Sequence, residues 1–331
     1  MTRPTAALPA SFIAALALTA APALAAPQVV TDIPAVQSLT AAVMQGVGEP
    51  ALLLDRGASP HHFQLRPSQA AALDGADLVI WLSPHLTPWM ARAVTALPKA
   101  DAVLQLDQAP GLYTQAYGAG DDDGGHGGHD DHGHAHDHDH GHDHDHGHDH
   151  DHDGHDHSGT DPHLWLDPSN ARLWLGVIRD RLAAIDPENA ATYAANAERA
   201  DAELAALDGE LAAQLAPIKD KPFAVFHDAY GYFTGHYGLR PAVSVALGDA
   251  ALPGAQRLAG LRDQMAEGHV ACAFPEAQHD PKLIDQLIEG TAVTRGAALD
   301  PSGSTLEPGA ALYPALLRGM AQVLTDCLAG K

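Results

Sequence analysis

Histidine and aspartate alternate almost without interruption in one stretch of the chain, residues 121–157. Imidazole and carboxylate at this density bind divalent metal ions, so the composition indicates a metal-binding segment. No apolar side chain larger than that of Ala135 occurs in it. It therefore buries too little surface to offset the entropy of ordering, and we expect disorder. Its fifteen histidines are candidate ligands for weak accessory metal binding: His126, His129, His132, His134, His136, His138, His140, His142, His144, His146, His148, His150, His152, His155 and His157.

Two plainer interpretations of this tract are a solvated acidic linker and a purification tag. A tag is usually a pure histidine run at a terminus, whereas the tract is mixed and internal. We expect its metal binding to be multiple, weak and dependent on pH, because an imidazole must be neutral to coordinate a metal. A flexible segment supplies no fixed geometry, so a specific site must lie elsewhere.

Three of the other histidines occupy positions where a folded chain builds sites. His61 lies in the turn that follows a strand-like run at 51–55, His163 comes directly after the tract, and His227 ends the strand-like run 223–226. Asp300 ends another such run in the same way. We expect all four at strand carboxyl ends or in the loops after them. Three imidazoles and one carboxylate would form a four-coordinate site suited to Zn²⁺.

A single histidine at a strand end is more often a hydrogen-bonded structural residue than a metal ligand. The coincidence of three in a chain with a histidine tract favours the metal site. We interpret the remaining histidines as structural or surface groups: His85, His236, His269 and His279. Three aspartates are candidate acceptors for the ring N–H groups of the ligands: Asp167, Asp228 and Asp249.

Short β-type runs alternate with helical patterns on both sides of the tract, which predicts an α/β fold with two lobes, each with a mainly parallel sheet flanked by helices. The predicted strands are 28–32, 51–55, 76–82, 102–106, 223–226, 242–246, 271–274 and 292–299. The predicted helices are 33–46, 67–74, one from about 168, 229–237, 254–267, 281–289 and 312–328. Between the halves, apolar residues recur every three or four positions, which predicts one long connecting helix at 187–216. Its apolar stripe is Tyr193, Ala197, Ala200, Leu204, Leu207, Leu211 and Leu215.

The chain divides accordingly into a leader and three further parts. Residues 1–25 carry one arginine, a short apolar run and the small-residue sequence at 23–25, which together are typical of a cleaved secretory signal peptide. A buried helix is the alternative for the apolar run. The N-terminal lobe then covers 26–186 and contains the tract, the connecting helix covers 187–216, and the C-terminal lobe covers 217–331. A ligand cleft is expected between the strand ends of the two lobes.

The formal net charge is −24. An acidic body with a more acidic tract argues against nucleic acid and anionic membranes as partners and favours cationic ligands. The only two cysteines, Cys272 and Cys327, predict one disulfide in an oxidising compartment. Two free thiols or thiolate metal ligands are the alternatives.

Several segments in order resemble the ZnuA-like zinc-binding proteins of bacterial ABC importers, the cluster A-I family of substrate-binding proteins. They are the GASPH run 57–61 with LRPS at 65–68, PHLWLDP at 162–168, FHDAYGY at 226–232, and the segments around Cys272, Asp300 and Cys327. An acidic, histidine-rich loop before His163 is also common in that family. The resemblance covers essentially the whole chain after residue 25.

By this resemblance His61, His163 and His227 are the metal ligands, and Cys272–Cys327 is the family's disulfide. For the fourth ligand, relatives use a carboxylate at the position of Asp300, water, or an acidic residue just before the first histidine. Pro60 removes that last option here, and His62 is an extra imidazole that could compete or face solvent. The resemblance also implies a rigid helix between the lobes and little hinge motion.

The function predicted is that of a periplasmic, monomeric protein that captures Zn²⁺ with high affinity and delivers it to a membrane ABC permease, without enzyme activity. Periplasmic zinc chaperones are further candidate partners. The tract would gather zinc, sense it or shield the cleft. A manganese-specific protein of the same fold is an alternative that three imidazoles disfavour.

Two other classes of function remain open. A secreted zinc-dependent hydrolase needs a general base beside the metal, and no such residue is evident in the sequence. A metal buffer or sensor would make the tract itself the functional part.

Overall fold

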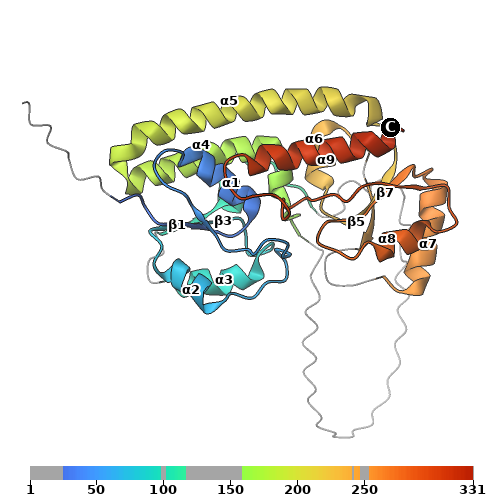
Figure 1. Cartoon of the computed structure of the whole chain (residues 1–331), viewed down its shortest axis with the longest axis horizontal. Coiled ribbons are helices and arrows are strands. Elements are labelled where there is room, and N and C mark those ends of the chain that lie inside the picture. Colours follow the sequence, from blue (N-terminus) through green and yellow to red (C-terminus); the bar gives the residue numbers. More distant parts are fainter. Residues whose placement is uncertain (1–24, 98–101, 117–158, 241, 247–252, 331) are drawn as a thin grey trace, which may run out of the picture.

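The structure, a computed structural model, describes residues 25–97, 102–116, 159–240, 242–246 and 253–330. Figure 1 shows two α/β lobes side by side beneath long helices. Among the helices of the described residues, none is long and apolar enough to cross a membrane. The predicted leader and the tract lie outside these residues.

Each lobe contains a four-stranded, fully parallel sheet. The first has the order β2-β1-β3-β4 and the second repeats it as β6-β5-β7-β8. In each sheet the second strand in the chain is added on one side of the first strand, and the later strands are added on the other side. This change of side lies between β1 and β3 in the first sheet and between β5 and β7 in the second. Crevices at the carboxyl ends of such pairs are where α/β sheets bind ligands. The predicted α/β fold with two lobes is confirmed. The strands are β1 Val29–Thr31, β2 Ala51–Leu52, β3 Leu78–Trp81, β4 Val103–Gln105, β5 Phe223–His227, β6 Val243–Ala246, β7 Cys272–Phe274 and β8 Thr294–Arg295.

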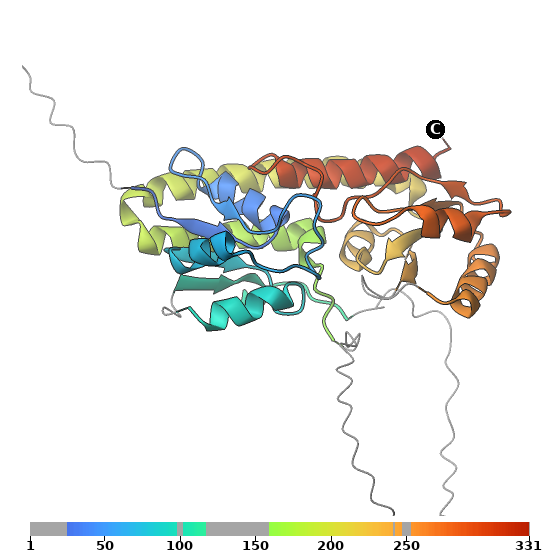
Figure 2. The same cartoon turned by 60° about the horizontal axis from the view of Figure 1, so that its bottom comes forward.

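Helices cover both faces of each sheet. Figure 2 shows the longest helices together on one side of both lobes. The helices on the long side are α1 Pro34–Val43, α4 Pro168–Ile185, α5 Ala190–Leu215, α6 Gly231–Tyr237 and α9 Leu312–Leu328. Those on the other side are α2 Pro67–Asp74, α3 Pro88–Thr95, α7 Ala255–Glu267 and α8 Lys282–Ile288. The described residues also include the 3₁₀ turns η2 Leu106–Gln108, η3 Leu164–Leu166, η4 Pro187–Asn189 and η5 Ala216–Ile218.

The connecting helix α5 has 26 residues and runs along both lobes (Figure 1). Its buried residues are the seven of the predicted apolar stripe, from Tyr193 to Leu215. It packs on α1 and α4 of the first lobe and on α9, which returns from the second lobe. The helix therefore contributes one apolar face to a layer shared by both lobes.

The main hydrophobic core is continuous from one lobe to the other. It contains β1 and β3, the stripe of α5, the buried face of α9, and one face of the second sheet through Phe223 and Val225. The alternate residues Ala224 and Phe226 point to the opposite face and form a separate, smaller core with α7 and α8. The two lobes thus share most of their buried apolar surface.

The predicted disulfide is confirmed. Cys272, the first residue of β7, is bonded to Cys327 in the last turn of α9. The sequence separation is 55 residues. A loop of this length indicates a stabilisation of roughly 4 kcal/mol on the chain-entropy model. The bond fixes the end of α9 to the centre of the second sheet.

Two elements differ from the predictions. The sequence pattern predicts no helix between the third and fourth strands, whereas the structure has α3 there. The strand predicted at 292–299 is only β8 Thr294–Arg295, and both of its residues are exposed. Gly296 follows, where the backbone passes so close to Phe274 that a Cβ would lie 2.2 Å from its ring. A close approach, and not a buried alternating strand, explains this glycine.

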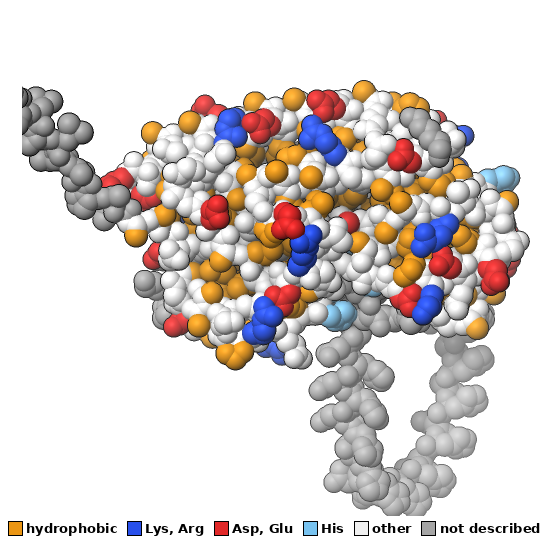
Figure 3. Space-filling view, in the orientation of Figure 1, with side chains coloured by type: hydrophobic (Ala, Val, Ile, Leu, Met, Phe, Trp, Pro, Cys, Tyr) orange, Lys and Arg blue, Asp and Glu red, His pale blue; other side chains and the backbone are white. Residues whose placement is uncertain are grey.

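Charged side chains on the face seen in Figure 3 are of both signs and lie scattered over the body. Several form pairs between segments, such as Arg56 with Glu307 and Arg318 with Glu210. No patch of basic residues is visible on this face.

Candidate metal centre

His61 lies on the loop between β2 and α2, and this loop is fastened at several points. Trp89 of α3 donates its indole N–H to the carbonyl of Pro60 at 2.7 Å. From the second lobe, Gln278 donates to the carbonyl of Ala58 at 2.8 Å. The backbone N–H of His61 bonds to Ser59 Oγ at 3.2 Å. The loop is thus positioned by both lobes, although His61 itself is half-buried.

His163 lies directly before η3 and is buried. It was expected in a loop after a strand, but the apolar run Leu164–Leu166 that follows it is a buried 3₁₀ turn. The indole of Trp165 donates to the carbonyl of Pro301 at 2.8 Å, and Tyr313 donates to the carbonyl of Trp165 at 2.7 Å. The turn that carries His163 is therefore fixed by contacts with the C-terminal segments.

Asp161 holds the ring of His163. Its Oδ1 lies 2.7 Å from His163 Nδ1 and also accepts the His163 backbone N–H at 3.0 Å. The side chains of both residues are almost fully buried. Gln115 donates its amide to Asp161 Oδ2 at 3.1 Å, and Tyr232 of α6 donates to the Asp161 carbonyl at 3.0 Å. Residues from both lobes therefore orient this aspartate.

His227 is the last residue of β5, as predicted, and Glu276 holds its ring. The two carboxylate oxygens lie 2.8 and 2.7 Å from His227 Nδ1. Glu276 follows β7, the neighbour of β5 in the sheet, and its side chain is 0% exposed. A metal-binding histidine commonly donates one ring N–H to a carboxylate, which fixes the tautomer and leaves the other nitrogen for the metal. His163 and His227 both have this arrangement.

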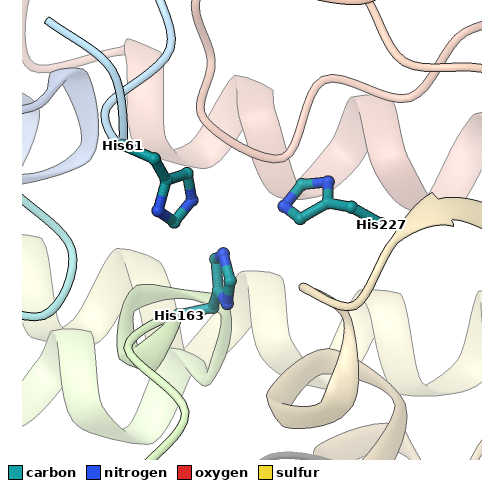
Figure 4. A group of neighbouring side chains, drawn as sticks. All are labelled: His61, His163 and His227. Carbon is teal, nitrogen blue, oxygen red and sulfur yellow. The ribbon is translucent and has the colours of Figure 1, made fainter. Parts of the chain in front are cut away.

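The three imidazoles face one another across the gap between the lobes (Figure 4). One ligand nitrogen from each lies within 4.8 Å of those of the other two. The ring centroids are 5.3 Å apart for His163 and His227, 5.4 Å for His61 and His163, and 6.1 Å for His61 and His227. Three imidazoles on one tetrahedral Zn²⁺ have centroids about 5 Å apart. The site thus needs only a small inward shift of the His61 loop to hold the ion.

Asp300 does not belong to this group in the structure. Its Oδ1 accepts from Ser304 N and Oγ at 2.9 and 3.2 Å, and its Oδ2 accepts from Thr305 N and Oγ1 at 2.9 and 2.6 Å. The carboxylate therefore organises its own loop. Asp300 directly follows Leu299, whose backbone pairs with that of Glu276 in a parallel β-bridge beside the centre.

The neighbouring His62 is exposed, whereas His61 is half-buried.

Of the predicted acceptors, Asp167 accepts from Ser169 N at 2.7 Å as the N-cap of α4 and lies 3.0 Å from His236 Nδ1. Asp228 Oδ1 lies 3.5 Å from Ser244 Oγ. Asp249 is outside the described residues. The carboxylates found on His163 and His227 are those of Asp161 and Glu276, which were not predicted.

His279 also lies beside the centre, although a structural or surface role was predicted for it. Its Nε2 is 3.8 Å from Glu276 Oε2, and its ring centroid is 6.1 Å from that of His227. The other three histidines placed in that class are His85 and His269, which are exposed, and His236, which binds Asp167 and Asp208.

The histidine-rich tract lies outside the described residues, but the residues that flank it are described. Ala116 pairs with Thr160 in an antiparallel bridge, and Asp161 donates its N–H to the Gln115 carbonyl at 2.9 Å. The described residues that flank the tract are thus adjacent, and Asp161 is two residues from His163.

Comparisons with known proteins show the family of the chain. The family model described as zinc-uptake complex component A, periplasmic (ZnuA) matches residues 29–327. The chain belongs to this family. It is 54% identical over 323 residues to the high-affinity zinc uptake system protein ZnuA of Paracoccus denitrificans (strain Pd 1222), covering 97% of this chain and 98% of the relative.

More distant relatives match over similar lengths. The protein of the same name from Brucella abortus (strain 2308) is 39% identical over 305 residues, with 91% of each chain covered. A solved structure titled as the crystal structure of ZnuA superposes with a TM-score of 0.70 and 23% identity, over 91% of this chain and 99% of that chain. At this identity the likeness to the solved structure concerns the fold.

Proposed function

We propose that this protein captures Zn²⁺ in the periplasm and delivers it to the permease of an ABC importer. The observation that supports this most is the group of three histidines, two of them buried and held by buried carboxylates. The relatives named as zinc uptake proteins support the same assignment. Their family model is named for a component of an uptake complex, which favours a binding role over an enzyme.

His61, His163 and His227 are the proposed ligands. Three neutral imidazoles suit Zn²⁺ better than Mn²⁺, which prefers carboxylate and water oxygens. Because Asp300 is bonded within its own loop, we assign the fourth position to water in this conformation. Asp161 and Glu276 are bonded to ring nitrogens of the ligands, so neither serves as the general base that a hydrolase would need.

We propose the tract at 121–157 as an accessory, weaker zinc-gathering segment. Its histidines alternate with carboxylates, and the described residues that flank it, Ala116 and Thr160, pair next to Asp161. Zinc held there would be concentrated close to the centre. If the same residues instead sense zinc, their deletion should alter growth at a zinc level other than the scarcest.

The remaining organisation is proposed as follows. Residues 1–25 form a cleaved signal peptide, and the protein functions as a monomer. The lobes 26–186 and 217–331 are joined by 187–216 and move little against each other, because they share one core and the helix α5 runs along both. The ABC permease is the proposed partner, and zinc chaperones are secondary candidates.

Growth of a bacterium that depends on this protein for zinc tests the proposal. In zinc-depleted medium, His163→Ala should abolish growth, while His85→Gln, an exposed histidine outside the centre, should leave it intact. Deletion of 121–157 should slow growth only when zinc is scarcest. Normal growth of the His163→Ala strain, with the protein present at normal levels, would reject the proposed function.

A further inference from the structure

The two carboxylate oxygens of Glu276 have different surroundings. Oε1 accepts from Tyr230 Oη at 3.0 Å, from the His227 backbone N–H at 3.3 Å and from His227 Nδ1 at 2.8 Å. Oε2 shares the contact with His227 Nδ1 and lies 3.8 Å from His279 Nε2. Oε1 thus accepts the bonds from Tyr230 and from the His227 backbone, and Oε2 is the carboxylate oxygen that faces His279.

The ring of His279 is held in place on two sides. It stacks on Phe226 of β5 with centroids 4.1 Å apart and planes 16° from parallel. Its backbone N–H bonds to the Glu276 carbonyl at 3.2 Å, which closes the turn after β7. Nε2 is therefore directed to Glu276 by a strand of the sheet and by a hydrogen-bonded turn.

We propose that Glu276 and His279 form, together with His227, a second ligand set for a divalent cation, beside the three-histidine centre and sharing one ligand with it. One ligand atom from each of the three residues lies within 4.8 Å of the others. The inference rests on the proposed function for the identity of the ion, Zn²⁺.

The distances suit an ion with nitrogen and oxygen ligands. Two ligand atoms on one tetrahedral Zn²⁺ are about 3.3 Å apart. The 3.8 Å between His279 Nε2 and Glu276 Oε2 exceeds this by half an ångström, which small rotations of the two side chains remove. A cation here also offsets the cost of burying the Glu276 carboxylate, whose side chain is 0% exposed.

Both ligand sets, the three histidines and the set with Glu276 and His279, include His227. One ion can therefore occupy either set but not both at once. When the ion moves, bonds to His61 and His163 break while bonds to Glu276 Oε2 and His279 Nε2 form. Because both oxygens of Glu276 face His227 Nδ1, an ion held by Glu276 binds His227 through Nδ1, and the Nδ1 proton passes through solvent to Nε2, the nitrogen that the ion leaves. The second set thus lets the ion leave or enter the centre by exchanging ligands one at a time, without becoming fully hydrated between the lobes.

Crystals of the full chain with zinc, measured at the zinc absorption edge, test the placement of the ion. In the wild type we expect the main peak between His61, His163 and His227. In His163→Ala we expect a peak about 2.0–2.2 Å from His279 Nε2 and Glu276, and in the double variant with His279→Phe no peak there. Phenylalanine retains the stack on Phe226, so loss of the peak reports the missing nitrogen. A His163→Ala crystal with no zinc at His279 would overturn the inference, whereas a wild-type crystal with no zinc at the three histidines would instead reject the proposed function.

A kinetic experiment tests the role in exchange. Wild-type protein loaded with one equivalent of zinc is mixed with excess chelator, and the release rate is recorded. His279→Phe should release zinc at least five-fold more slowly, and His85→Gln should release it at the wild-type rate. An unchanged or faster rate in His279→Phe would contradict the proposed exchange path and leave His279 as a ring that packs on Phe226.

Discussion

At the scale of single residues, the centre depends on which ring nitrogen of each histidine is available. A carboxylate on Nδ1 fixes the neutral tautomer whose Nε2 carries the lone pair for a metal. Asp161 supplies this for His163, and Glu276 supplies it for His227. Because both pairs are buried, their orientation is set before any ion binds.

Replacing Glu276 by glutamine keeps its size but removes its charge. We expect zinc affinity to fall by about 10- to 100-fold, the usual effect of losing a partner of a metal-binding histidine. Competition with a chelator for the first, tightest equivalent of zinc measures it. Glu267→Gln, at the exposed end of α7, is the matched control. Affinity within two-fold of wild type in Glu276→Gln would show that this carboxylate does not support His227.

Asp300→Asn distinguishes water from carboxylate in the fourth position. Asn retains one acceptor oxygen for the bonds to Ser304 or Thr305 but is a poor zinc ligand. With water as the fourth ligand, the same titration should give an affinity within about three-fold of wild type. A loss of 30-fold or more would restore Asp300 as a ligand.

The histidines of the centre could be predicted from the sequence, but most of their partners could not. His61, His163 and His227 stand next to strand-like or apolar runs, which is a local signal. Glu276 lies 49 residues from His227, and only the order of β5 and β7 in the sheet brings them together. Asp161 could have been predicted from the sequence, since a carboxylate two residues before a candidate ligand can form a hydrogen bond with the ring of that ligand.

At the scale of elements, the first turn of α6 packs against the segment that carries Asp161. A Cβ on Gly231 would lie 2.2 Å from Gln115 Nε2 and 3.4 Å from Asp161 Oδ2. Gly231 is thus required for Gln115 to reach Asp161. The chain of contacts runs from α6 through Gln115 and Asp161 to His163.

Gly231→Ala should therefore displace the Gln115 amide and lower zinc affinity by roughly three- to ten-fold, a mild case of lost support for a ligand. Folding stability should change by less than about 1 kcal/mol, because Gln115 is flexible and alanine favours a helix. Gly235→Ala on the same helix is the control, since its Cβ would lie 3.9 Å from Gln115 Oε1. Equal zinc affinities of the two variants would refute this contact chain.

How well an element could be predicted depends on what stabilises it. The apolar stripe of α5 repeats over about six turns, and each of its residues was predicted. The helix α3 is short and was not predicted, and only Trp89 and Met90 in it are buried. β8 was predicted too long because most residues of the run 292–299 are apolar, whereas the chain there passes close to the ring of Phe274 at Gly296.

At the scale of the whole molecule, His236 links three parts of the chain. From α6 in the second lobe its Nε2 lies 2.8 Å from Asp208 of α5, and its Nδ1 lies 3.0 Å from Asp167, the N-cap of α4 in the first lobe. Burial alone would lower the pKa of His236, but the two carboxylates outweigh it and raise the pKa above 6.5. The protonated imidazole thus connects the lobes through two ion pairs.

Because the folded-state pKa of His236 is raised, its contribution to stability is complete below pH 6.5 and disappears as the pH rises through the folded value. Urea unfolding of the zinc-free protein should show that His236→Gln loses about 1.5–3 kcal/mol at pH 5.5, the range for hydrogen bonds of charged groups, and less at pH 9. His85→Gln should show no such trend. A loss that grows with pH would contradict the assignment.

The central claim is that the tight zinc site is the three-histidine centre and not the tract. Zinc titration against a strong chelator, with the full chain, a chain lacking 121–157 and His163→Ala, tests it most directly. The deletion should retain one tight equivalent within about three-fold of wild type. His163→Ala, with every tract histidine present, should lose at least 100-fold in affinity, since one of three protein ligands is gone. Tight binding that survives in His163→Ala and disappears with the tract would contradict it.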